Sequence, residues 1–73
     1  MTLIHHRTIL LEIINGLLKG DFHNYHYEGI TLARSESTKS NWIFTTGKDC
    51  RMINMDHNTP MGVANLLAKK IME

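Results

Sequence analysis

The sequence predicts an α+β fold with the element order α-β-β-β-α, in which a three-stranded antiparallel sheet carries two helices packed on one face. Three observations support this prediction. Apolar residues near both ends of the chain recur with the period of a helix, the middle of the chain alternates with the period of a strand, and the links are short and polar. A chain of 73 residues is long enough for one domain and too short for two, so residues 1–73 are expected to form a single domain.

The first helix is predicted over residues 3–19. Leu10, Ile14 and Leu17 recur at spacings of three and four, which is the period of one helix face. Thr2 is a suitable N-cap, and a lysine followed by a glycine stands where the helix would end.

This first helix has an unusually wide apolar face. Ile4 and Leu11 lie outside the simple stripe of residues that one core contact would need. A helix of this kind is either enclosed by its own domain or partly covered by another chain. We therefore expect a homodimer or a foreign protein partner.

Three strands are predicted, over residues 25–34, 42–46 and 50–55. In the first of them, Ile30 and Leu32 would face one side and Tyr25 and Tyr27 the other, because successive side chains of a strand alternate. The links between the three segments are polar or contain glycine, which favours an antiparallel meander.

The middle strand leaves two alternatives open. Trp42 and Phe44 point to one side of the sheet and Ile43 points to the other. If Ile43 and Ile53 face the helices, then Trp42, Phe44 and Met52 form an exposed patch of the kind that marks an interface. If the sides are reversed, the two aromatic residues belong to the core, as most large aromatic residues do.

The last helix is predicted to begin at Thr59 and Pro60, since threonine is a good N-cap and proline suits the first helical position. Two lysines near its end would interact favourably with the negative end of the helix dipole. Its expected buried face consists of Val63, Leu66, Leu67 and Ile71.

The order α-β-β-β-α over about seventy residues resembles the double-stranded-RNA-binding fold. The resemblance lies in the topology alone. In that fold the last helix opens with a lysine cluster that clamps phosphates, whereas here it opens with the segment 59–63 (TPMGV), and Lys69 and Lys70 come at its far end. We therefore infer no membership of that family.

Composition argues against several classes of protein. Hydrophobic residues make up 42% of the chain, charged residues 21%, and the net charge is +1, which is ordinary for a globular protein and lower than a dedicated nucleic-acid binder usually carries. Cys50 is the single cysteine, so no internal disulfide can form and a cytoplasmic location is expected. The longest apolar stretches are interrupted by polar residues, so no membrane span is expected.

No metal, cofactor or enzymatic activity is expected. His23 and His26 fall in or beside a predicted strand and would point to opposite sides, and no paired Cys/His motif for zinc is present. Cys50 is interpreted as a small buried hydrophobic residue rather than a nucleophile. The serines and carboxylates show no catalytic spacing, and no small-molecule substrate is expected.

The leading functional hypothesis is a small non-enzymatic protein-interaction module, a regulator or inhibitor of a larger macromolecule, of the kind that phages and other mobile elements often encode. Its expected partner-binding residues are Trp42, Phe44, Met52, Tyr25, Tyr27, Ile4 and Leu11. The alternative is a nucleic-acid-binding domain with a basic surface formed by Arg34, Lys39, Lys48 and Arg51.

Overall fold

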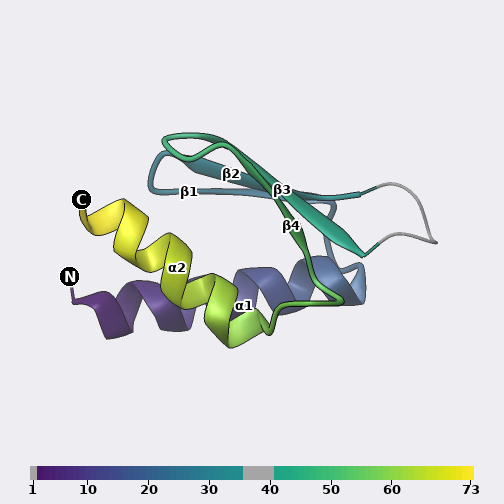
Figure 1. The fold of residues 1–73 in the computed structure, drawn as a ribbon, viewed down its shortest axis with the longest axis horizontal. Coiled ribbons are helices and arrows are strands. Elements are labelled where there is room, and N and C mark those ends of the chain that lie inside the picture. Colours follow the sequence, from purple (N-terminus) through teal and green to yellow (C-terminus); the bar gives the residue numbers. More distant parts are fainter. Residues whose placement is uncertain (1, 36–40) are drawn as a thin grey trace.

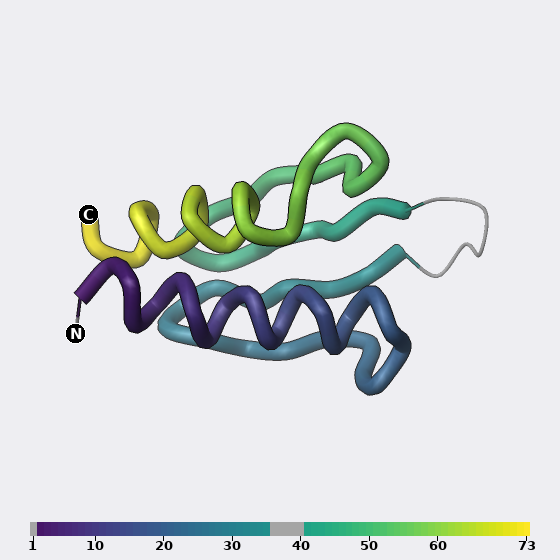
Figure 2. The backbone as a smooth tube through the Cα atoms, turned by 90° about the horizontal axis from the view of Figure 1, so that it is seen from below, coloured from purple at the N-terminus to yellow at the C-terminus, as the bar shows by residue number. Residues whose placement is uncertain are grey.

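A computed structural model describes residues 2–35 and 41–73 of the chain. Figure 1 shows two layers, an antiparallel sheet and two helices that both cover the same face of that sheet. The strands follow one another as a meander in the order β1-β2-β3-β4, and the two helices lie side by side with the chain termini at one end (Figure 2). The elements are α1 (Leu3–Lys19), β1 (Asn24–Tyr27), β2 (Ile30–Arg34), β3 (Trp42–Gly47), β4 (Arg51–Asn54) and α2 (Pro60–Met72).

The α+β class, the two helices and the antiparallel sheet are confirmed, but the prediction of three strands is wrong. The segment predicted as one strand is split into β1 and β2 by a two-residue turn at Glu28 and Gly29, whose φ angles are 50° and 82°. Two consecutive positive φ angles are typical of the tight hairpin turn whose twist matches that of its strands. The order is therefore α-β-β-β-β-α, which also removes the topological resemblance to the double-stranded-RNA-binding fold.

The hairpin reverses the predicted orientation of two tyrosines. Tyr25 pairs with Leu32 and Tyr27 with Ile30, and directly paired residues share a face of the sheet. Both tyrosines therefore lie on the same face of the sheet as Ile30 and Leu32, which is the face that the helices cover. The prediction had placed them on the other face.

Helix α1 has the predicted bounds and caps. The side chain of Thr2 accepts a hydrogen bond from the backbone N–H of His5 at 3.2 Å, and Gly20 ends the helix with a left-handed φ of 83°. Gly16 lets the helix approach the chain that follows it, since a Cβ atom at this position would lie 2.4 Å from the ring of Phe22.

Helix α2 begins as predicted, but its buried face differs. Thr59 accepts a hydrogen bond from the N–H of Gly62 at 3.0 Å, and Pro60 occupies the first turn. The buried residues are Val63, Ala64, Leu67 and Ala68. Leu66, which was predicted to be buried, is 41% exposed because it lies on the flank of the helix beside β4.

The core lies between the sheet and the helices, and it decides the orientation of the middle strand. Ile43 is fully buried and Ile53, its partner on β4, is 7% exposed. Met55 completes this side of the sheet, with an exposed fraction of 7%. Trp42 and Phe44 therefore point away from the helices. None of the helices in residues 2–35 and 41–73 is both long and apolar enough to cross a bilayer.

Candidate functional site: the outer face of the sheet

The strand register defines the face of the sheet that the helices leave uncovered, which we call the outer face. Its central row runs across all four strands through Asn24, Ala33, Phe44 and Met52. The rows on either side of this central row belong to the same face. Together, the described residues of the outer face are Asn24, His26, Thr31, Ala33, Trp42, Phe44, Thr46, Met52 and Asn54.

Apolar side chains gather at the β3–β4 side of this face. Met52 is 66% exposed, while Trp42 and Phe44 are half-buried. On the β1–β2 side the face is polar, and the Nδ1 atom of His26 lies 2.9 Å from the hydroxyl oxygen of Thr31. Aromatic residues and methionine are both enriched at protein interfaces relative to the rest of the protein surface.

The outer face carries very little charge. Among its described residues, none is a lysine, arginine, aspartate or glutamate, and His26 is the one titratable side chain. Burial of this surface would therefore require the desolvation of few charged groups, which is the main penalty for burying polar protein surface.

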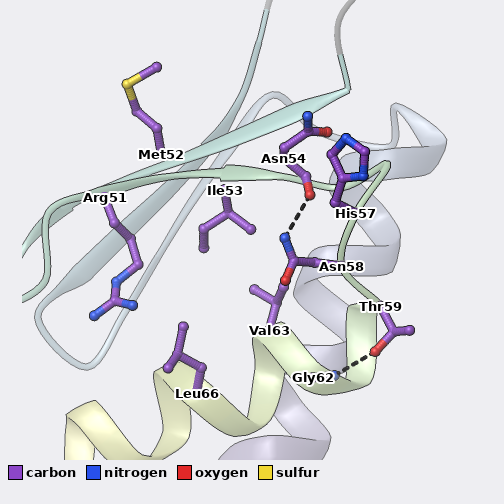
Figure 3. Close-up of a pocket in the computed structure, with 10 residues that line it drawn as sticks. All are labelled: Arg51, Met52, Ile53, Asn54, His57, Asn58, Thr59, Gly62, Val63 and Leu66. Carbon is purple, nitrogen blue, oxygen red and sulfur yellow. Dashed lines mark hydrogen bonds between the residues drawn. The ribbon is translucent and has the colours of Figure 1, made fainter.

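A groove of about 510 Å³ lies beside the outer face, between β4 and α2. Figure 3 shows that Met52 points away from this groove, while Ile53 from β4 and Val63 and Leu66 from α2 point into it. The side-chain amide of Asn58 closes one end by donating a hydrogen bond to the carbonyl oxygen of Asn54 at 2.8 Å. The edge strand β4 thus has the exposed Met52 on the outer face and, on its helix side, a groove whose lining is partly polar and partly apolar.

Tyr25 and Tyr27 attach β1 to the helical layer and are not part of the outer face. Tyr25 packs against Phe22 with ring centroids 5.2 Å apart. The hydroxyl of Tyr27 lies 2.8 Å from Nδ1 of His6, a buried residue of α1. Burial raises the pKa of Tyr27, and the negative charge of Glu28 raises it further.

The remaining predicted partner-binding residues, Ile4 and Leu11, lie on α1. Ile4 is 63% exposed, whereas Leu11 is partly buried and packs against the core. Since α1 covers the opposite face of the sheet, the seven predicted residues do not form one surface. Trp42, Phe44 and Met52 are the three that the fold brings together.

Two of the four basic residues of the alternative hypothesis bind helix ends. The guanidinium of Arg34 donates to the carbonyl oxygens of Leu18 at 3.0 Å and Leu17 at 3.5 Å, in the last turn of α1. The ammonium of Lys48 donates to the carbonyl of Ile71 at 2.7 Å, in the last turn of α2. Both cations therefore neutralise the partial negative charge that a helix carries at its C-terminus.

The other two basic residues do not extend a basic patch. Arg51 lies on the helix side of β4 and pairs with the buried carboxylate of Asp49, with the arginine Nη2 atom 3.1 Å from the nearer carboxylate oxygen. Lys39 lies outside the described residues. Over the described part of the chain, no three His, Cys, Asp or Glu side chains are grouped so that they could hold a metal ion.

Sequence reasoning missed the roles of Arg34, Lys48 and Asp49, since each depends on which elements meet in three dimensions. One signal was present for Asp49, because the oppositely charged Arg51 lies only two residues further along the chain. Comparison with known proteins gave no match to a family model, to a curated protein or to a solved structure.

Proposed function

We propose that this chain is a small non-enzymatic protein-interaction module that regulates or inhibits a larger macromolecule, and that its outer face binds the partner protein. The single observation that carries the proposal is the composition of that face: Trp42, Phe44 and Met52 point away from the core, and no lysine, arginine or acidic side chain stands among its described residues. The proposal assigns the chain no catalytic step, metal or cofactor.

The energetics of the three side chains support a binding role. A half-buried tryptophan or phenylalanine still has apolar surface to lose to a partner, and aromatic residues contribute disproportionately to protein interfaces. The buried aliphatic residues on the other side of the sheet already supply the core. The outer aromatic residues are therefore not needed to fill that core, and they keep some surface that a partner can cover.

The charge distribution favours protein over nucleic acid as the partner. Phosphate binding requires lysine or arginine side chains directed at the ligand. Arg34, Lys48 and Arg51 are instead directed at helix carbonyls or at Asp49.

Site-specific photo-cross-linking tests the proposal. A photo-reactive phenylalanine analogue would replace Phe44 on the outer face and, as the matched control, Glu12 on the exposed side of α1. Both variants would be irradiated in a lysate of the organism that encodes the chain. We expect a protein adduct from position 44, absent from position 12, that excess unlabelled wild-type chain prevents and excess Trp42→Ser chain does not.

The competition step makes the result specific to the outer face, because Trp42→Ser changes that face without touching the core. A nuclease-sensitive adduct, an adduct from position 12 alone, or no adduct from position 44 would each contradict the proposal.

A further inference from the structure

Strand β4 is one edge of the sheet, and its backbone leaves hydrogen-bonding groups directed outward. The N–H of Met55 donates to the carbonyl of Asn41 across the β3–β4 ladder at 2.7 Å. In an antiparallel ladder the residues alternate in the direction of their N–H and C=O groups. Ile53 and Arg51 therefore face β3, like Met55, and both backbone groups of Met52 point away from the sheet.

We propose that β4 pairs with β4 of a second copy of this chain, antiparallel and centred on Met52, so that two four-stranded sheets join into one sheet of eight strands. The two-fold axis would pass between the two Met52 residues. Each would donate its N–H to the carbonyl of the other, since the same residue supplies both groups in an isologous contact. This self-association uses the backbone edge of β4, and it leaves Trp42 and Phe44 on the outer face for the partner protein proposed above.

The spacing of the helices supports a second copy as the occupant. In this fold two helices cover four strands, so each helix covers the width of about two strands. Two strands span roughly 9.6 Å. This width matches the usual distance of about 8–10 Å between the axes of packed helices. Continuing the sheet through a second β4 would bring the second α2 alongside the first at a similar distance. The two Leu66 side chains, each of which is 41% exposed in the single chain and lines the groove beside β4, would then lie on the facing flanks of the two α2 helices.

The other sheet edge lacks these features. On β1 the N–H of Arg34 donates to the carbonyl of His23, so His23 directs its backbone groups toward β2. Because this direction alternates along the strand, the backbone groups of Asn24 and His26 point outward. Their side chains are polar, whereas Met52 is apolar and 66% exposed. An exposed apolar edge strand is the kind that pairs with another chain.

Charge and size are compatible with this dimer. Arg51, the charged residue within β4, is already paired with Asp49 on the helix side, so pairing would bring no uncompensated charges together. A standard interface takes about 800 Å² from each partner. That area is roughly one sixth of the 4584 Å² that one chain exposes, and β4 and the adjoining flank of α2 lie side by side along the groove.

The test begins with the mass in solution, measured by light scattering over a concentration series. We expect a species of two 8.4 kDa chains. Met52→Lys would place two ammonium groups opposite each other across the axis and should raise the dimer dissociation constant at least about tenfold. Thr46→Lys, on the outer face but away from the edge, is the matched control and should leave the dissociation constant unchanged.

Disulfide trapping then identifies the edge. In a background of Cys50→Ser, the variant Met52→Cys should form a covalent dimer under mild oxidation, since directly paired residues place their Cα atoms about 5.5 Å apart. The variant His26→Cys in the same background tests the β1 edge and should remain monomeric on a denaturing gel.

A monomer at every concentration, or a dimer trapped through position 26 or through neither position, would overturn the proposal. A foreign protein cross-linked at Phe44 would in that case still support the proposed function, so the two can fail separately.

Discussion

The substitutions Ile43→Ala and Phe44→Ala should differ sharply in their effect on the free energy of unfolding, although the two residues are adjacent in β3. Ile43 is fully buried beneath the helices, and truncation of a buried isoleucine to alanine costs about 2–5 kcal/mol. Phe44 is half-buried on the uncovered face, so we expect about 1–2 kcal/mol, less than the usual cost of truncating a buried phenylalanine. A chain of this length is expected to have a total stability of roughly 4–11 kcal/mol, so the difference is large.

Urea unfolding measures this difference directly. Trp42 is the single tryptophan and reports by fluorescence, with circular dichroism as a second probe. With a slope of about 1 kcal/mol per M, Ile43→Ala should lower the midpoint by roughly 2–5 M and Phe44→Ala by roughly 1–2 M. All variants are compared at one protein concentration, because dimerisation would contribute to the apparent stability.

If Ile43→Ala does not fold, Ile43→Val supplies the same test, with an expected loss of about 0.5–1.5 kcal/mol. Thr46→Ala, at an exposed position of the same strand, is the control and should change the midpoint little. A cost for Phe44→Ala equal to or greater than that for Ile43→Ala would refute the assignment of the two faces.

Three further predictions follow from particular contacts. Arg34→Gln should lower the free energy of unfolding by about 1–2 kcal/mol in urea titrations, because the last turn of α1 loses its charged donor; an unchanged midpoint would contradict this role. Gly47→Ala should destabilise by more than about 1 kcal/mol in the same assay, since a Cβ at this φ of 92° would lie 2.3 Å from the carbonyl oxygen of Gly29; a neutral effect would show that the turn can move. Burial and the charge of Glu28 raise the pKa of Tyr27 above its unfolded value of 10.0. The neutral hydroxyl therefore contributes stability below pH 10, and this contribution is lost as the pH rises through the folded pKa. The drop in melting temperature above pH 10 should be smaller in Tyr27→Phe than in the wild type.

The helices were predictable from sequence because their signals are local. The period of three and four in α1 and the sequence Thr59-Pro60 before α2 depend on residues close together in the chain. The extent of burial was less predictable. Leu66 fits the apolar period of α2 but lies on its flank, and only the position of the helix relative to β4 decides its exposure.

The turn between β1 and β2 was missed although the sequence contained a signal for it. Tyr25 and Tyr27 occupy odd positions and Ile30 and Leu32 even ones. In a single strand these two sets face opposite sides, but across a two-residue turn they share one side, as the structure shows. Glu28-Gly29 lacks the asparagine or aspartate that usually marks such a turn, so the sequence alone favours one continuous strand.

The composition of the candidate site followed from the alternation of β3 and β4, but its orientation did not. Trp42 with Phe44 and Ile43 with Ile53 are both apolar sets, so the pattern alone does not say which one faces the helices. The hydrogen-bond acceptors of Arg34 and Lys48 could not be predicted from the sequence either, because they lie 16 or more residues away along the chain.

The most direct test of the central claim, that the uncharged outer face binds a protein, is the salt dependence of the dissociation constant between this chain and the partner cross-linked at Phe44. The measurement compares about 50 mM with about 200 mM salt, at chain concentrations where self-association is constant. We predict a change of less than about threefold, because the described residues of the outer face include no lysine or arginine that would release counterions. A weakening of about 10³-fold or more would show that phosphate contacts dominate and would contradict the account.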